Sequence, residues 1–473
     1  LIGGRTMPSE KSMVIIFMLV LYVLFMVYLT WIGRNKAKNL TDFLTAGREG
    51  SLILIASSYL GNHVGTGIVI GGATYGVTYG LGGAWYGIGA AISFILFGLI
   101  VAGWAYNHKY LTIPSYLRDR YPKTGRAMTV VWSLLSAAVS VTTLTGQIIA
   151  GRQLFTYLGI DPLLGSIISV LVILLYCTVT GMWGTIMVGF WQAVIILVGL
   201  VIAMFCCFSG GGWGTVQANL SADHFDWIPF DGATLFAMCV PTAIYGLTSG
   251  NAMQLTASSN SKRSAIGGAL LGGVLVAIVT FFPVLLGMYG AAVYPDADAG
   301  SIIFTVIMET LPTWVAGLML AAIIAAVMST CDSTIIVVVT SIVYDTYKNV
   351  LAPAMHHTPS DKKMRNACSV ISVLLFVFAL VLSFTSNDII SILSSGYTIW
   401  VAGGMIPFMA GRLWKGTTSY GALAAMIVGS LVAWIDLLGI TNFPSSLVCL
   451  IPAAVTAVVV SLLTKEKTAP KAE

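Results

Sequence analysis

The chain is built almost entirely from long apolar stretches, and this feature limits it to one class of fold. About thirteen segments of mostly apolar residues follow one another between residues 10 and 464 with short connections. About 20 such residues cross the hydrocarbon core of a bilayer as an α-helix. Only 9% of the 473 residues are charged, whereas a soluble domain has about a quarter. The sequence therefore predicts an all-α membrane protein with about 13 transmembrane helices.

The basic residues divide unevenly between the predicted loops. With the N-terminus placed outside, all 23 lysines and arginines except Arg5, Lys11 and Arg152 fall in cytoplasmic loops or in the C-terminal tail. This distribution follows the positive-inside rule, and adding or removing one span would reverse every later loop. It predicts an odd number of spans in the cytoplasmic (plasma) membrane, with the N-terminus outside and the C-terminus inside. The net charge of +5 comes from membrane-flanking clusters, which argues against nucleic acid as a partner.

Two predicted spans are crowded with helix-disrupting residues near their middle. One contains Gly61–Gly67, and the other contains Pro241 followed by Gly246–Asn251. Glycine costs about 1 kcal/mol and proline about 3 kcal/mol per helix position relative to alanine. Interrupted helices in corresponding positions of two halves are typical of a transporter binding site, although glycine-rich helices can also simply pack closely. The two interrupted spans are five apart, as two inverted repeats of five helices would place them.

A third unusual segment, Ala321–Thr334, is rich in small residues and hydroxyls. Ser329, Thr330 and Ser333 place three hydroxyls within about one helical turn. Together with carbonyls freed by a helix break, they could coordinate Na+, or they could instead bond to their own or a neighbouring helix. Asp332 is the one acidic residue deep in a predicted span. Because an intramembrane carboxylate is costly unless paired, hydrated or cation-bound, Asp332 and Ser333 form a candidate second cation or proton site. The alternatives are a structural hydrogen bond of protonated Asp332, or a position nearer the cytoplasmic vestibule.

The segment Ala325–Ser333, which reads AAVMSTCDS, resembles the AAxMSTxDS signature of the sodium:solute symporter family. Shorter segments that also resemble this family are Ile70–Gly72, Tyr79–Gly82, Gly403–Phe408, Gly411–Lys415 and Gly421–Ala422. The resemblance covers nearly the whole chain and is nearest to the pantothenate, choline and proline symporter branches. It implies the LeuT-type fold, with two inverted five-helix repeats, one extra helix before them and two after.

This resemblance divides the chain into parts. They are an extracellular N-terminal tail at 1–9, an extra N-terminal helix at 10–33, inverted repeat 1 at 46–208, inverted repeat 2 at 231–411, two extra C-terminal helices at 417–464 and a cytoplasmic tail at 465–473. We expect residues 1–6, which precede Met7, to be a cloning remnant.

The family couples solute uptake to an inward Na+ gradient through a site between its first and eighth core helices. The resemblance implies that backbone oxygens of Gly61, Val64 and Ala326 and the hydroxyls of Ser329 and Thr330 form this site.

The resemblance and the two helix breaks also imply a solute site beside the sodium site. Tyr397 and Trp400 are expected to form an outer lid over this site. The expected solute-binding residues are His63, Gly65, Ile68, Gly83, Gly87, Thr143, Gln147, Tyr245, Asn251, Tyr397 and Trp400. No arginine lies near the expected midplane, so strong bidentate recognition of a carboxylate is not indicated. Amino acids, small carboxylates, vitamins and nucleobase-like compounds all remain open.

Two positions depart from the family pattern. Some members use an aspartate on the fifth core helix for a second sodium ion, whereas this chain has Met187–Gly189 there, which favours a stoichiometry of one ion to one solute. His63 stands where Asn, Thr or Asp is usual. It could donate to a substrate or titrate, or it could be a neutral histidine satisfied by helix-end carbonyls.

The expected function is Na+-coupled import of a small organic solute by alternating access, by a protein that works as a monomer. Its partners are the solute, Na+ and the lipid bilayer. A proton-coupled transporter that uses Asp332 or His63 is one alternative, and a transporter-like sensor domain is another. An enzyme is least expected, because the sequence shows no paired carboxylates or metal-ligand spacing at mid-depth.

Overall fold

A computed structural model of the chain describes residues 10–33, 44–177, 181–385, 389–437, 440 and 448–464. Within these ranges the regular structure is helical, apart from an isolated parallel bridge between Gly50 and Ser259. The predicted tails at 1–9 and 465–473 lie outside the described residues.

The helices follow the predicted apolar segments in order. In the first half they are α1 (Glu10–Gly33), α3 (Leu52–His63), η2 (Gly67–Gly71), α4 (Gly72–Tyr79), η3 (Gly80–Ala84), α5 (Trp85–Phe97), η4 (Gly98–Ala102), α6 (Gly103–His108), α7 (Ile113–Arg120), α8 (Gly125–Tyr157), α9 (Pro162–Cys177) and α10 (Gly181–Phe208). In the second half they are α11 (Gly212–Asn219), α12 (Gly232–Tyr245), η6 (Gly246–Thr248), α13 (Gly250–Ser258), α14 (Lys262–Val279), α15 (Phe281–Val293), α16 (Ile302–Thr305), α17 (Thr313–Val339), η9 (Thr340–Leu351), α18 (Ala352–Ala354), α19 (Asp361–Leu382), α20 (Ile389–Leu413), α21 (Ser419–Leu437) and α22 (Leu450–Leu463).

The number of spans depends on how interrupted helices are counted. In the part of the chain that the structure describes, nine helices are long and apolar enough to cross a membrane, or ten if the bent pair α12 and α13 counts as one. Other predicted spans correspond to short helices, such as α9 and α22, or to the interrupted stretch at α3. The count of about thirteen therefore stays a prediction, because length alone does not decide whether a short or broken helix crosses.

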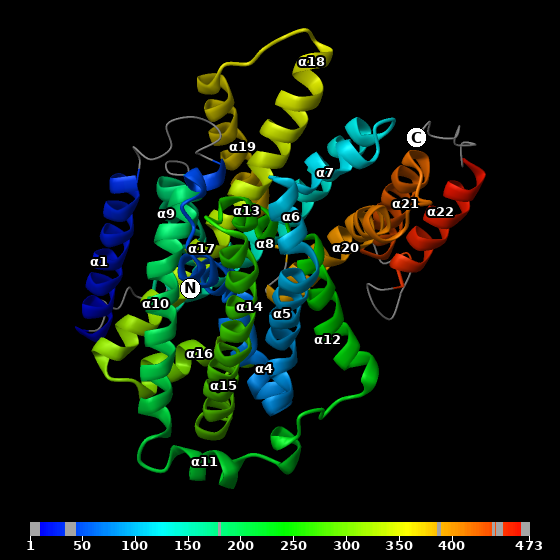
Figure 1. The fold of residues 1–473 in the computed structure, drawn as a ribbon. Helices are drawn as coiled ribbons and strands as arrows, with labels where there is room; N and C mark the ends of the chain where they lie inside the picture. Colours follow the sequence, from blue (N-terminus) through cyan, green and yellow to red (C-terminus); the bar gives the residue numbers. More distant parts are fainter. Residues whose placement is uncertain are drawn as a thin grey trace.

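The helices form one bundle, with α1 at one edge and α21 and α22 at the opposite edge (Figure 1). α11 lies across one end of the bundle, and α7 and α18 lie at the other (Figure 1). α17 contacts α1, α3, α8 and α10. In the most apolar window of each span, 78% of the residues are buried for α17 with η9, compared with 28% for α1. α17 is therefore a central helix of the bundle, and the segment that carries the hydroxyl motif is surrounded by protein.

Small residues allow the helices to approach closely. A Cβ at Gly76 in α4 would overlap the carbonyl of Val284 in α15, and a Cβ at Gly287 in α15 would overlap the carbonyl of Ala73. Glycine at both positions lets the two backbones touch, as is common where membrane helices associate. α4 is thereby fixed just beyond the predicted break, which positions the site described next.

Candidate functional site

The first predicted interruption is present at the end of α3. Val64, which follows the helix, has φ −77° and ψ 58°, and helical structure resumes at Gly67. The last carbonyls of a helix lack partners within the helix. The Val64 N–H donates to Leu60 O at 2.8 Å. The carbonyls of Gly61 and Asn62, which follow Leu60, are therefore available to groups outside the helix.

Two hydroxyls of α17 meet these freed carbonyls. Ser329 Oγ donates to Gly61 O at 2.6 Å, and Thr330 Oγ1 lies 3.2 Å from Asn62 O. Both hydroxyls also lie within hydrogen-bond distance of Ala326 O, at 3.1 and 3.0 Å. The junction between α3 and α17 therefore gathers five oxygen atoms without a formal charge.

Gly65 is required by this close approach. A Cβ at Gly65 would overlap the Thr330 hydroxyl, and a Cβ at Gly61 would lie 2.9 Å from the carbonyl of Gly189 in α10. Glycine therefore lets the end of α3 fit between α17 and α10. The glycines in this stretch do more than break the helix, because they also admit the neighbouring oxygens.

The second predicted interruption is present between α12 and α13, which are bent by 43°. Ser249 separates η6 from α13, and its hydroxyl accepts from the Ala252 N–H at 3.3 Å as an N-cap. Asn62 Nδ2 donates to Asn251 Oδ1 at 3.5 Å, so side chains at the two breaks contact each other. The structure thus confirms both interruptions and brings them together.

A pocket of about 70 Å³ lies between the two breaks, and it includes most of the predicted solute-binding positions. Its lining residues are Asn62, His63, Gly65, Thr66, Gly67, Ile68, Tyr86, Ser136, Val139, Ser140, Thr143, Gln147, Tyr245, Asn251, Thr330, Ser333, Thr334, Val337, Leu393, Tyr397 and Trp400. We call this the central pocket. Its walls come from α3, η2, α5, α8, α12, α13, α17 and α20, so residues far apart in the sequence converge on it.

Two predicted residues lie elsewhere. Positions 83 and 87 do not line the central pocket, because Gly83 packs against Tyr75 and Gly87 packs against Thr280. Tyr86, which lies between them in the sequence, lines the pocket instead. Gly83 and Gly87 allow close packing. The large polar side chain of Tyr86 between them is the sequence signal for the side of the helix that faces the pocket.

Aromatic rings form one wall of the central pocket. The ring centroids of Tyr245 and Tyr397 are 4.5 Å apart, and those of Tyr245 and Trp400 are 6.2 Å apart. Trp400 Nε1 donates to Thr248 O and Thr248 Oγ1 at 3.1 and 3.0 Å. Trp400 of α20 is therefore tied to the interruption between α12 and α13.

Five buried polar atoms around the pocket have no hydrogen-bond partner. They are Asn62 Oδ1, His63 Nδ1, Thr66 Oγ1, Gln147 Oε1 and Asn251 Nδ2, and each belongs to a residue that lines the pocket. Buried polar atoms are nearly always paired in proteins. This concentration of unpaired donors and acceptors is what a site for a polar ligand requires.

The sodium:solute symporter family model matches residues 43–429, which include both interruptions and the hydroxyl segment of α17. The chain belongs to the sodium:solute symporter family. Members of this family are transporters, and the fold agrees with that assignment. A Na+-coupled sialic acid symporter, in a substrate-bound outward-open state, superposes with a TM-score of 0.79 at 17% identity over 95% of this chain and 98% of that one.

Curated relatives extend over nearly the whole symporter. A sodium/proline symporter of Staphylococcus aureus is 24% identical over 95% of this chain and 92% of its own length. A sodium/pantothenate symporter of Escherichia coli K12 is 25% identical over 84% of this chain and 85% of its own length. Both relatives are named as sodium symporters, and their solutes differ from one another.

The predicted second cation or proton site is only partly in contact with the central pocket of the symporter. Ser333 lines the pocket, and its hydroxyl donates to Thr330 O at 3.0 Å. Asp332 is buried in α17 but is not among the lining residues. A Cβ at Gly61 would lie 2.9 Å from the carbonyl of Gly189 in α10, so the segment Met187–Gly189 is next to the end of α3.

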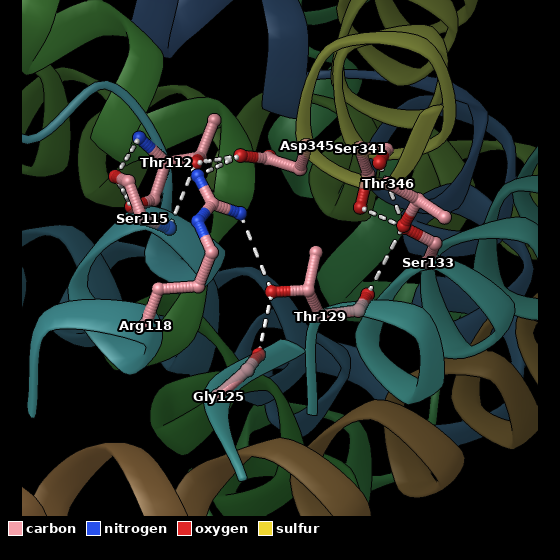
Figure 2. A network of polar contacts seen from close by, with 9 residues as sticks. All are labelled: Thr112, Ser115, Arg118, Gly125, Thr129, Ser133, Ser341, Asp345 and Thr346. Atoms are coloured by element: carbon pink, nitrogen blue, oxygen red, sulfur yellow. Dashed lines mark hydrogen bonds and ion pairs between the residues drawn. The ribbon is translucent and has the colours of Figure 1, made fainter. Parts of the chain in front are cut away.

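A second polar cluster, which sequence reasoning missed, lies further along the same long helix of the symporter (Figure 2). Asp345 in η9 is completely buried, and its Oδ1 lies 3.1 Å from an Arg118 guanidinium nitrogen. The same oxygen accepts from Thr112 Oγ1 at 2.9 Å. Arg118 also donates to Thr129 Oγ1 in α8 at 3.3 Å. One carboxylate oxygen therefore holds both the beginning and the last turn of α7.

Hydroxyls extend this cluster between α8 and η9 (Figure 2). Ser133 Oγ lies 2.7 Å from Ser341 O and 2.7 Å from Thr346 Oγ1. We call the group formed by Thr112, Arg118, Thr129, Ser133, Ser341, Asp345 and Thr346 the Asp345 cluster. It fastens the short helix α7 to α8 and η9 at the end of the bundle opposite α11 (Figure 1).

Proposed function

We propose that this symporter imports a small organic solute together with Na+ across the plasma membrane by alternating access. The observation that carries the proposal is the 2.6 Å contact between Ser329 Oγ and Gly61 O. It joins the hydroxyl segment of α17 to the carbonyl end of α3, which are the two halves of the predicted sodium site. The proposal keeps the orientation with the N-terminus outside and the monomer as the working unit.

In the proposed site, Na+ is held by Ser329, Thr330 and backbone oxygens of Gly61, Val64 and Ala326. Each hydroxyl has two lone pairs and one rotatable proton, so Ser329 and Thr330 can turn their protons away and offer oxygen to the ion. Carbonyls from interrupted helices coordinate Na+ in transporters of this architecture. An ion bound there would tie α3 to α17, and its release would free them to separate.

The sodium gradient supplies enough energy for uptake. One charge moving down about 100 mV gains about 2.3 kcal/mol, and a tenfold concentration ratio adds about 1.4 kcal/mol. Together they could sustain several-hundred-fold accumulation of a neutral solute per ion. A stoichiometry of one ion to one solute is therefore sufficient for concentrative import.

Alternating access is supported by the size and position of the central pocket. Its volume of about 70 Å³ corresponds to about five to seven water molecules at roughly 10–15 Å³ each, so a solute larger than this requires the pocket to widen. We propose that the inverted repeats at 46–208 and 231–411 move relative to each other around it. The two interrupted helices, one in each repeat, are the elements that would change shape.

The proposed solute-binding residues form a largely uncharged set. Gln147, Asn251 and Thr143 would hydrogen-bond the solute, the aromatic wall at Tyr245 would contact its apolar part, and Tyr397 with Trp400 would cover it. His63, Gly65 and Ile68 would contact it at the first interruption. No Lys, Arg, Asp or Glu lines the pocket among the residues that the structure describes, so Na+ and helix ends would have to meet any charge on the solute.

The experiment is direct sodium binding followed by uptake. Purified Ser329→Ala and Thr330→Ala variants should bind radioactive sodium at least about tenfold more weakly, which corresponds to about 1.4 kcal/mol. Ser372→Ala is a matched control, because that serine is buried and its hydroxyl bonds Cys368 O of its own helix. Proline, pantothenate and sialic acid uptake into proteoliposomes would then be compared with sodium or choline outside. Unchanged sodium binding in both variants would refute the site.

Proton coupling through Asp332 or His63 is the alternative that the sequence leaves open. Its prediction is that uptake persists when choline replaces sodium and that Asp332→Asn or His63→Gln removes the dependence on a pH gradient. Sodium coupling predicts instead that uptake stops in choline, with Asp332→Asn impairing coupling without preventing expression.

A further inference from the structure

A large apolar cavity lies outside the proposed transport path. It has a volume of about 260 Å³ and is lined by residues of α1, α8, α9 and α17. Leu154 of α8 and Val172 of α9 form two of its walls, and Val327 and Met328 of α17 form another. It shares no lining residue with the central pocket, so it is a separate feature of the fold.

The chemistry of the lining excludes water as the natural occupant. Ser169 is its one polar side chain, and the Ser169 hydroxyl donates to Gly165 O at 2.8 Å. A buried water needs two to four polar partners, and an apolar cavity of about 150 Å³ stays dry and takes up benzene instead. This cavity is larger than that, and leaving it empty would forfeit the dispersion contacts of every wall.

The cavity is continuous with the surface that faces the bilayer. Val20 and Leu24 line it and are 50% and 58% exposed. They belong to the same side of α1 as Phe17 and Tyr28, which are also exposed. In a membrane span this surface contacts lipid tails, so the cavity opens onto a medium of acyl chains.

We propose that this cavity is a binding site for one acyl chain of a membrane phospholipid, which enters between α1 and α9 and ends against α17. The chain would reach Val327 and Met328, which are 5% and 1% exposed and immediately precede Ser329. The site suits an acyl chain because its walls offer packing surface without free hydrogen-bonding side chains. Its occupant would contact the helix that carries the hydroxyl motif on a different side from α3.

Photolabelling in lipid nanodiscs tests the proposal. The protein is reconstituted with a phospholipid that carries a diazirine in the middle of one acyl chain, irradiated, digested and mapped by mass spectrometry. The expected result is adducts on Val327 or Met328, which surface lipid cannot reach, in addition to adducts on exposed residues such as Val377 and Val381 of α19.

Variants of α1 provide the matched comparison. Val20→Trp places a large side chain at the mouth of the cavity and should abolish the adducts on Val327 and Met328. Val27→Trp changes the same residue type at an exposed position of α1 that does not line the cavity, and it should leave them. Val172→Phe fills the cavity from α9 and should also abolish them, which guards against misfolding of a single variant.

Two results would overturn the proposal. One is wild-type protein labelled on exposed residues such as Val377 but not on Val327 or Met328, which would mean that another apolar group, such as a helix of a second copy, closes the cavity. The other is full labelling of Met328 in folded Val20→Trp and Val172→Phe, which would mean that lipid reaches α17 by a different route.

Discussion

The central pocket and the Asp345 cluster lie along the same long helix, yet they satisfy their polar atoms in opposite ways. Around the central pocket, five buried polar atoms have no partner, whereas in the Asp345 cluster only Asp345 Oδ2 has none. The pocket is lined by uncharged groups, and the cluster contains a buried ion pair. Unpaired buried donors and acceptors are concentrated in the region proposed to receive the solute, and mostly paired ones in the region that fastens helices together.

The largest expected effect comes from breaking the ion pair of the cluster. Removing one partner of a buried pair costs about 3–5 kcal/mol, so Arg118→Ala should lower the free energy of unfolding by about that amount. Asp345→Ala should cost less, because Arg118 is 19% exposed and can turn to water, whereas Asp345 is fully buried. Thermal unfolding in detergent measures both.

Two further variants sharpen this prediction. Arg126→Ala removes an exposed arginine nearby and should leave the unfolding midpoint unchanged. The double variant Arg118→Met with Asp345→Leu should recover most of the lost stability, since apolar replacements of a buried pair are often neutral. If Arg118→Ala unfolds like the wild type, the cluster does not fasten α7.

The second largest effect is expected where α3 meets α17. Gly65→Ala would force a methyl group against the Thr330 hydroxyl, and overpacking of this kind costs about 1–3 kcal/mol. Sodium binding should therefore weaken at least several-fold. Gly189→Ala is the control, because a Cβ there meets only Asn62 Oδ1 at 3.9 Å.

A double-mutant cycle identifies the cause. In a Thr330→Ala background the overlap is absent, so adding Gly65→Ala should change sodium binding little further. Such non-additivity is expected for residues in contact. Equal effects of Gly65→Ala in both backgrounds would mean that backbone conformation, and not the hydroxyl, makes glycine necessary at this position.

Sequence reasoning found the pocket better than it found the cluster. The two interruptions and the AAVMSTCDS segment were local patterns, and the structure places Ser329 against Gly61 as expected. Which side of a helix faces the pocket is harder to predict from sequence. Gly83 and Gly87 were therefore expected to line the pocket, and Tyr86 between them was missed. Arg118 and Asp345 are 227 positions apart in the sequence, so no local pattern predicts their contact. Arginines near the ends of membrane spans are common because of the positive-inside rule, and Arg118 alone therefore does not indicate a buried ion pair.

A smaller effect than that of Gly65→Ala is expected from a substitution in the aromatic wall of the central pocket. Trp400→Phe replaces the indole by a phenyl ring and removes the donation from Nε1 to Thr248 O and Oγ1, and a hydrogen bond of this kind contributes about 1 kcal/mol. Solute KM should rise several-fold while sodium binding to the protein without solute stays the same, because the Trp400 N–H donates to Thr248 and not to the sodium-site oxygens. A fall in sodium binding as large as the rise in KM would place Trp400 in the structural support of both sites.

The smallest and most discriminating prediction compares two serines on α8. Ser133 belongs to the Asp345 cluster, where its hydroxyl meets Ser341 and Thr346, and Ser140 lies two turns away and lines the central pocket. Ser133→Ala should lower the free energy of unfolding by about 1 kcal/mol and leave solute KM unchanged. Ser140→Ala should do the reverse, raising KM with little change in unfolding. If both variants lose only stability, the face of α8 that carries Ser140 does not contact the solute, although Ser140 lines the central pocket.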